Sequence, residues 1–112
     1  MMSHVVLMAP RPDLSDEERD AFMAAFERAI HGIPSVRGVR IGTRVKIGAQ
    51  YEAAMPETGE YLAVIDFDDR EGLDAYLRHP EHEALGRLFY QTLSSALVYD
   101  FEVGGVERLY RR

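Results

Sequence analysis

The order of hydrophobic segments predicts an α+β fold in which a four-stranded antiparallel sheet carries helices on one face. Segments with alternating apolar residues predict strands, and segments with apolar residues at helical spacing predict helices between them. The elements follow the order β-α-β-β-α-α-β without an internal repeat or a linker. We therefore expect residues 1–112 to form one domain with a split βαβ arrangement.

The first expected strand spans His4–Met8. Because side chains alternate across a strand, its residues divide between two faces: His4, Val6 and Met8 against Val5 and Leu7. Apolar side chains occupy both faces, which indicates a central strand. Pro10 and Pro12 are expected to end it.

The first helix is expected from about Ser15 to about His31. Ser15, followed three residues later by Glu18, is typical of a capping box. Apolar residues then recur at the spacing of one helix face: Phe22, Met23, Phe26, Ala29 and Ile30. Gly32 and Pro34 are expected to end the helix.

A second strand is expected over Val36–Ile47, where apolar residues alternate with basic residues and Gly. One of its faces is therefore expected to be buried and the other polar or thinned by Gly. The segment Gly48–Gly59 contains Pro56 and small residues, which predict an exposed loop. Tyr51 in this loop has no obvious place in the core. Either it borders a pocket or the loop is an ordinary surface loop.

The segment Glu60–Phe67 alternates and is rich in aromatic and branched residues, which predicts a half-buried third strand. Asp68 or Asp69 is expected to cap a short helix behind it. Pro80 disfavours the helical conformation at His79, so this helix is expected to stop near His79.

A third helix is expected to start near Glu83, because apolar residues share one face behind it: Leu85, Leu88, Phe89, Thr92 and Leu93. The last strand, Ala96–Val103, alternates again. Gly104 and Gly105 release the chain, and we expect Val106–Arg112 to pack on a partner or to fray.

Composition limits the classes of partner and compartment. The formal net charge of -6 opposes nucleic-acid binding, which depends on neutralising phosphates, and we interpret Arg108, Arg111 and Arg112 as a solvated basic tail. The absence of Cys removes disulfides and thiolate chemistry and fits a reducing compartment. The first apolar run is too short for a signal-peptide core or a membrane helix. We expect a cytoplasmic protein that binds neither nucleic acid nor membranes.

The combination of motifs resembles the stress-responsive dimeric A/B barrel (Dabb) family. An aromatic strand ending in Phe67 leads through an acidic turn to a helix with Tyr76 and then to His79-Pro80-Glu81-His82. His4 at the head of the first strand and Ile33-Pro34-Ser35-Val36 before the second strand agree with the same family. The resemblance covers nearly the whole chain. It implies a ferredoxin-like protomer that pairs as a dimeric α+β barrel.

A homodimer is also expected from the residue pattern itself. The strands carry apolar residues on both faces, and the helices suffice for only one face. A second copy supplies a second sheet, and two-fold symmetry is the commonest way to do so. We expect the two sheets to meet through these faces and to bury about 800 Å² per protomer.

The resemblance implies a site but not a single function, because the family includes plant stress proteins, a plant polyketide cyclase and many bacterial members of unknown role. In the cyclase, residues that match His82, Tyr76 and His4 line a pocket between sheet and helices. His82 would be the general base and Tyr76 would polarise or anchor a carbonyl. Tyr61 stands where the cyclase has another His, and the further candidates for ligand contacts are Tyr61, His79 and Tyr51.

No organic cofactor is expected. Two imidazoles without a third convergent ligand make a poor zinc site, so no metal is expected at His79 and His82.

Two alternatives to a lyase-type or cyclase-type enzyme remain. The first is a non-catalytic, stress-associated dimer in which the same side chains serve structure or ligand binding. In the structural role His4 bonds a neighbouring element, Tyr76 fills the core, His82 holds the turn, and His79 faces solvent or caps a helix. The second is a cofactor-free monooxygenase of the related ferredoxin-like dimers. A cavity reached by His82, Tyr76 and His4 together favours an enzyme, and a packed site favours the structural role.

Overall fold

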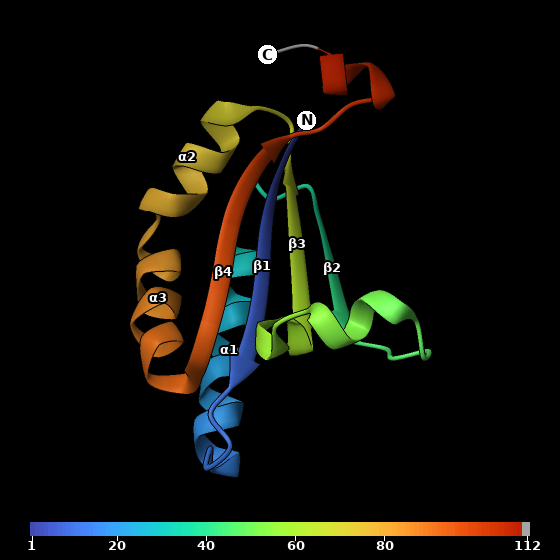
Figure 1. The fold of residues 1–112 in the computed structure, drawn as a ribbon. Helices are drawn as coiled ribbons and strands as arrows, with labels where there is room; N and C mark the ends of the chain where they lie inside the picture. Colours follow the sequence, from blue (N-terminus) through green and yellow to red (C-terminus); the bar gives the residue numbers. More distant parts are fainter. Residues whose placement is uncertain (111–112) are drawn as a thin grey trace.

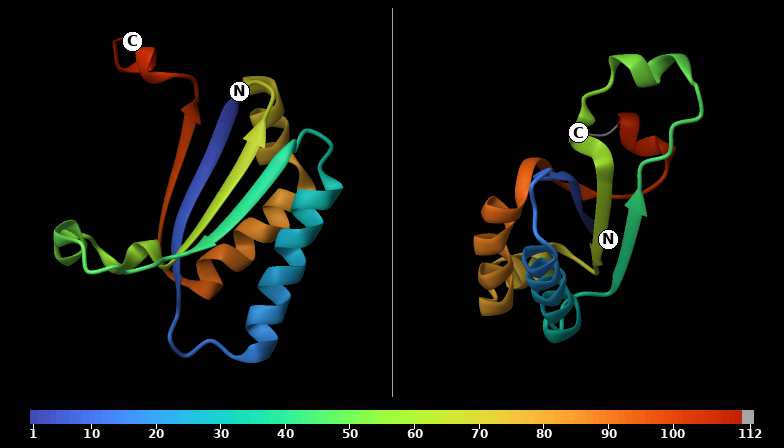
Figure 2. Two further views of the ribbon diagram at one scale, coloured as in Figure 1. Left: turned by 90° about the vertical axis from the view of Figure 1, so that its right-hand side faces the viewer. Right: turned by 90° about the horizontal axis from the view of Figure 1, so that it is seen from below.

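The computed structural model describes residues 1–110, which form a four-stranded antiparallel sheet with α-helices packed on one face (Figure 1). The strands are β1 (Met2–Pro10), β2 (Gly38–Thr43), β3 (Tyr61–Phe67) and β4 (Leu93–Glu102), and their order in the sheet is β2-β3-β1-β4. The helices are α1 (Asp16–Gly32), α2 (Arg70–Arg78) and α3 (Pro80–Thr92). This is the predicted ferredoxin-like α+β arrangement, and Figure 2 shows the sheet from its edge with the helices on one side.

The helix α1 follows the sequence prediction closely. Ser15 is its N-cap and forms a complete capping box with Glu18, with both bonds at 3.1 Å. These bonds from Ser15 lower the pKa of Glu18. α1 has 17 residues, and no helix in residues 1–110 has the length and apolar character needed to cross a membrane.

The strand β2 is shorter than the predicted segment. The alternating pattern continued to Ile47, but β2 ends at Thr43, which pairs with Tyr61 at the start of β3. One further bond, from Arg44 N to Glu60 O at 2.9 Å, extends this pairing. Alternation predicts a strand only as far as a neighbouring backbone is available to bond it.

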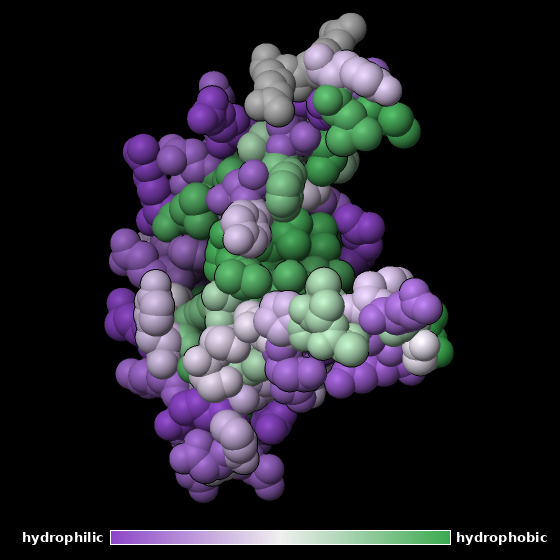
Figure 3. All heavy atoms as spheres, in the orientation of Figure 1, coloured by the Kyte–Doolittle hydropathy of each residue, from purple (hydrophilic) through white to green (hydrophobic). Residues whose placement is uncertain are grey.

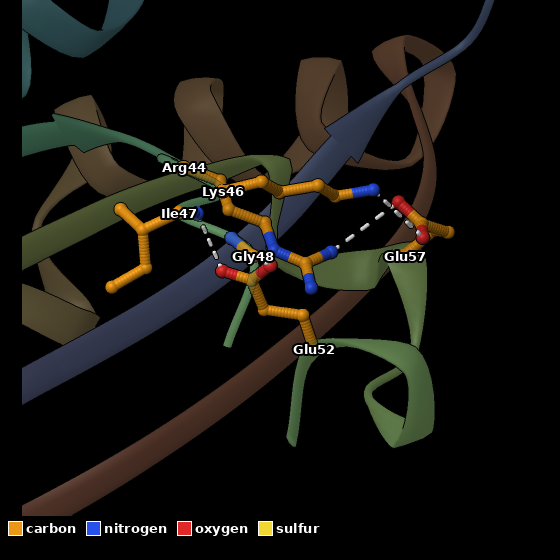
Figure 4. A network of polar contacts seen from close by, with 6 residues as sticks. All are labelled: Arg44, Lys46, Ile47, Gly48, Glu52 and Glu57. Carbon is orange, nitrogen blue, oxygen red and sulfur yellow. Dashed lines mark hydrogen bonds and ion pairs between the residues drawn. The ribbon is translucent and has the colours of Figure 1, made fainter. Parts of the chain in front are cut away.

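Residues 44–60 form an arm that projects on the side of the sheet opposite the helices (Figure 2). Where the sequence predicted an exposed loop, the arm contains two short 3-10 helices, η1 (Gln50–Ala54) and η2 (Glu57–Glu60). Polar contacts hold its shape (Figure 4): Ile47 N and Gly48 N donate to Glu52 at 2.7 and 3.0 Å, and Arg44 and Lys46 pair with Glu57. The backbone bonds lower the pKa of Glu52.

The helix α3 begins at Pro80, not near Glu83 as predicted. Proline suits a first helical position, because an N–H there would have no partner in the helix. His79 is the N-cap, and its Nδ1 accepts a hydrogen bond from Glu81 N at 3.1 Å. The same proline ends α2 at Arg78, as the sequence predicted.

The helix α2 begins at an acidic N-cap, for which the sequence offered two candidates, Asp68 and Asp69. Asp69 is the N-cap, and its Oδ1 accepts from Gly72 N at 2.9 Å. We expect Asp69→Ala to lower the free energy of unfolding by about 1 kcal/mol in urea titrations, because a backbone donor loses its partner. Asp69→Asn keeps an oxygen acceptor, so its free energy of unfolding should stay within a few tenths of a kcal/mol of the wild-type value. Equal losses in the two variants would contradict a capping role.

The core lies between the sheet and the helices. Tyr76, Phe67 and Ile65 are its largest fully buried side chains, and the rings of Phe67 and Tyr76 lie 5.2 Å apart. Ala25 and Ala29 of α1 are also buried in the core and lie in the same cluster. Small residues on α1 thus let the helix approach the sheet, and the α2 aromatic fills the remaining space.

The opposite face of the sheet, here called the open face, is apolar (Figure 3). Strand register assigns these apolar residues to it: Val5, Leu7, Leu62, Val64, Leu97, Tyr99 and Phe101. The predicted division of the first strand between two faces is confirmed, since His4, Val6 and Met8 are buried on the helix side. An exposed apolar area of this kind indicates an interaction surface.

The chain leaves β4 through Gly104 and Gly105 and forms a last 3-10 helix, η3 (Val106–Tyr110). Arg108 pairs with Glu102 at 3.3 Å. Arg111 and Arg112, which the sequence analysis assigned to the same basic tail, lie outside the described residues.

Candidate functional site

A hollow of about 480 Å³ lies between the sheet and the helices, and His4, Tyr76 and His82 all line it. Most of the remaining wall is apolar and includes Val6, Met8, Phe22, Phe26, Leu85 and Phe89. Tyr90 at its border is 90% exposed, so the hollow reaches the surface. The structure thus brings together the three side chains that the family resemblance implied as an acid–base group.

Each of the three comes from a different element. His4 lies on the helix-facing side of β1, two residues before buried Val6, because side chains alternate along the strand. Tyr76 is on α2, and His82 is in the first turn of α3 just after the His79 cap. The Tyr76 ring is 5.8 Å from His4 and 4.7 Å from His82, centroid to centroid. The phenol ring is therefore within contact range of both imidazoles.

Asp100 is a member of the site that the sequence did not reveal. Its Oδ1 lies 2.6 Å from Nδ1 of His4, and the two residues are register partners across β1 and β4. A carboxylate accepts from a ring N–H, so the bond assigns the proton to Nδ1 of His4. A neutral His4 then has Nε2 free as an acceptor. The sequence indicated that Asp100 lies in an alternating strand. It did not indicate the strand register that places Asp100 beside His4.

Burial raises the pKa of Tyr76 to about 12. The phenolate would lose its hydration in this position, so the protonated form is strongly favoured near neutral pH. Tyr76 can therefore act as a hydrogen-bond donor but not as a base.

The pKa of His82 is lowered from the ordinary histidine value. Burial is the largest cause, and repulsion from His4 acts in the same direction. A backbone hydrogen bond with Leu77 and the nearby Glu83 carboxylate oppose the shift. His82 is consequently held in its neutral form at neutral pH, which is the form that can accept a proton.

The other predicted ligand contacts lie elsewhere. His79 caps α3 and does not line this hollow. Tyr61 lines a second hollow of about 470 Å³ next to α1 and β2. Tyr51 lies on η1, is 65% exposed and lines neither hollow.

The two hollows share four wall residues: Met8, Phe22, Phe26 and Leu93. The second hollow is apolar apart from a few groups such as Arg19 and Glu27. The two spaces are therefore neighbours, with the paired rings of Phe22 and Phe26, 6.4 Å apart, in both walls.

The charge of the first hollow restricts its ligands. None of the described residues that line it is Lys or Arg, so no fixed cation faces a carboxylate or phosphate there. Within residues 1–110, no three His, Asp or Glu side chains converge to hold a metal ion. The walls suit an uncharged organic molecule with one polar end near His4, Tyr76 and His82.

Comparison with known proteins identifies related folds. The model of the Stress Responsive A/B Barrel Domain (Dabb) matches residues 2–103. A search of curated proteins found no significant match.

Three solved structures illustrate the likeness. A protein from Arabidopsis thaliana has a TM-score of 0.77 and 20% identity, with 95% of this chain and 98% of that chain covered. A hydroxynitrile lyase from Passiflora edulis has a TM-score of 0.76 and 13% identity, with 92% and 93% covered. A dimeric ferredoxin-like protein of unknown function from Thermobifida fusca has a TM-score of 0.69 and 19% identity, with 91% and 90% covered. At these identities the likeness establishes the fold and leaves the chemistry to the site.

Proposed function

Because the chain belongs to the stress responsive A/B barrel domain (Dabb) family, we propose that it is a homodimer that binds an uncharged organic molecule and moves a proton beside its carbonyl group. The observation that carries this proposal is the convergence of His82, Tyr76 and His4 on one hollow of about 480 Å³. The apolar wall would hold the carbon skeleton. The second hollow next to it offers room for a longer apolar part.

In the proposed reaction His82 removes a proton from the carbon next to the carbonyl. The C–H bond breaks, its electron pair forms the enolate, and the proton goes to the free imidazole nitrogen of His82. Tyr76 donates a hydrogen bond to the carbonyl oxygen, where negative charge develops. His4 donates a hydrogen bond from Nδ1–H to Asp100, and its Nε2 is available to accept from a hydroxyl or enol of the ligand. A polyketide-cyclase-like ring closure begins with a step of this kind.

The direct test is exchange of α-protons with solvent deuterium in a panel of uncharged ketones and β-diketones, followed by NMR. We expect accelerated exchange for at least one apolar member of the panel. Binding without exchange would support the second candidate, a non-catalytic ligand-binding dimer, which the mostly apolar wall also suits. A cofactor-free monooxygenase predicts oxygen consumption instead of exchange.

The proposed dimer joins the open faces of two copies. Its support is the apolar open face and the dimeric state of similar folds from Thermobifida fusca and Bacteroides fragilis. The arm of residues 44–60 and η3 project on the same side and flank this face (Figure 2). Analytical ultracentrifugation at micromolar concentration should give twice the mass of one chain, because about 800 Å² per partner is enough for a stable complex. A single-chain mass would contradict the dimer.

The proposed base predicts the pH dependence of the reaction. The pKa of His82 lies below its ordinary value, mainly because of burial. The neutral base therefore persists below the pH at which a free histidine protonates, and the rate should fall only on further acidification. The free energy of unfolding should also fall on acidification. As pH falls, the unfolded chain binds a proton at His82 before the folded chain does, so stability is lost between the ordinary histidine pKa and the lower pKa of folded His82. A pH profile of exchange with its acid limb at or above the ordinary histidine pKa would contradict this assignment.

A further inference from the structure

The strand β4 has one face in the candidate site and the other in the open face. Ala96 and Val98 line the first hollow, and Asp100 on the same side bonds His4. Alternate residues of the strand are register partners of open-face residues on β1: Leu97, Tyr99 and Phe101. Any change in the position of β4 therefore acts on both surfaces at once.

In a single copy β4 is paired along its length with one strand and, within residues 1–110, has no strand on its other side. It is an edge strand that pairs only with β1, and every residue from Ser94 to Glu102 is exposed. Tyr99 and Phe101 are 54% and 49% exposed. Edge strands with few buried contacts open more readily than central ones. Yet this strand carries the carboxylate that determines which nitrogen of His4 bears the proton.

The open face is complementary to itself. Bulky side chains stand along β4, whereas β2 at the opposite edge presents Gly38, Arg40 and Gly42. A two-fold axis along the strands sets β4 of one copy against β2 of the other. By strand register Phe101 is then level with Gly38 of the other copy, and Leu97 is level with Gly42. Tyr99 is level with Arg40, whose side chain can lie against an aromatic face.

The fold of one copy does not explain these glycines. Neither Gly38 nor Gly42 has a positive φ. An added Cβ would meet Asp66 Oδ2 at 3.7 Å at the first position and Leu62 at 3.8 Å at the second, which are ordinary contacts. A side chain would fit there in an isolated chain. Space kept free on this face suits the bulky row of a second copy.

We infer that association of two copies through the open face holds β4 in place and thereby maintains the His4–Asp100 contact that one copy already forms, so that self-association and occupancy of the hollow are linked. The inference rests on the proposed dimer and site. Because linkage is reciprocal, a ligand that fills the hollow and touches β4 also tightens the dimer. The partner thus contributes to the site through the strand and not through a side chain of its own.

The test uses the tautomer of His4, which needs no ligand. In protein labelled with ¹⁵N-histidine, NMR at a pH well above the ordinary histidine pKa reports whether Nδ1 or Nε2 carries the proton. The titratable groups around the two site imidazoles are Asp100 on β4, Tyr76 on α2 and Glu83 on α3. At such a pH the phenol of Tyr76 stays protonated, because burial raises its pKa to about 12, and a change in the His4 tautomer reports a change in geometry.

The variant Gly42→Glu separates the partner's effect from a local one. Gly42 lies on β2, at the opposite edge of the sheet from β4. We expect wild type to be dimeric with the Nδ1–H tautomer at His4. Gly42→Glu should be monomeric and folded, with His4 shifted towards Nε2–H and with amide exchange in residues 96–100 faster by about tenfold or more. Ala75→Glu adds the same charge on an exposed position of α2 and should match wild type.

The outcomes are distinct. A folded, monomeric Gly42→Glu with an unchanged His4 tautomer and unchanged β4 exchange overturns the inference while the proposed site stands. A wild type that is monomeric throughout overturns the dimer, and the inference with it. If Gly42→Glu does not fold, dilution of wild type through its dissociation range gives the same comparison, with a tautomer that follows the dimer fraction as the supporting result.

Discussion

The variant His82→Ala is expected to lower the rate of α-proton exchange by about 10²–10⁴-fold, the usual contribution of a positioned general base. The physical reason is the neutral imidazole at this position, where burial is the largest cause of the lowered pKa of His82. The exchange rate at saturating ketone, measured by NMR, isolates the proton-transfer step. Ligand affinity should change less, because most of the wall is apolar and stays intact.

The control for this variant is His31→Ala. His31 is exposed in the last turn of α1, so the same substitution is made outside the site. Both variants should remain dimeric, since neither residue lies on the open face. Equal exchange rates in His82→Ala and wild type would remove His82 as the base. Unfolding of His82→Ala would instead support the structural alternative, in which this side chain holds the turn.

Local signals explain why most of the fold was predictable from the sequence. Capping at Ser15 and Asp69 depends on bonds within one turn of helix. The two faces of β1 follow from alternation alone. The His79-Pro80 step ends one helix whatever surrounds it. Such signals involve neighbours in sequence, so one chain without relatives is enough to read them.

The sequence predictions that were wrong concern element boundaries and the arm, and two of these depend on contacts that leave no pattern in the local sequence. The end of β2 depends on where β3 stops pairing with it, and alternation up to Ile47 carries no information on that partner. The start of α3 was predicted late because Pro80 was interpreted only as a terminator, although it also suits a first turn. The arm owes its shape to Glu52 accepting two backbone N–H groups, a contact that leaves no periodic pattern.

The site residues also differ in how far they could be predicted from local sequence. Tyr76 and His82 are close in sequence, and one helix break brings them to the same hollow. His4 and Asp100 are 96 positions apart and meet through strand register alone. The resemblance to the Dabb family therefore implied the acid–base group, whereas the carboxylate that orients His4 required the structure. The proposed link between β4 and the site could not be predicted from the sequence either. It depends on which face of β4 lies in the hollow and which lies in the open face.

Tyr76 carries the second large expected effect, because its ring and its hydroxyl have separate roles. The ring is fully buried against Phe67, so Tyr76→Ala should lower the free energy of unfolding by about 3–5 kcal/mol, as for other large aromatics in cores. Tyr76→Phe keeps the ring and should unfold within about 1 kcal/mol of wild type. Loss of the hydroxyl should nevertheless lower the exchange rate by about 10²–10³-fold, because the developing enolate loses a donor.

Comparing the two Tyr76 variants separates a core aromatic from a working phenol. Urea unfolding measures what the ring contributes to stability, and α-proton exchange measures what the hydroxyl contributes to the rate. Burial keeps that hydroxyl protonated by raising the pKa of Tyr76 to about 12. A slower Tyr76→Phe with wild-type stability assigns the hydroxyl to the reaction. If Tyr76→Phe is as fast as wild type while Tyr76→Ala is unstable, the residue only fills the core. The carbonyl would then need another donor, and His4, the remaining polar side chain beside the Tyr76 ring, would be the group to replace next.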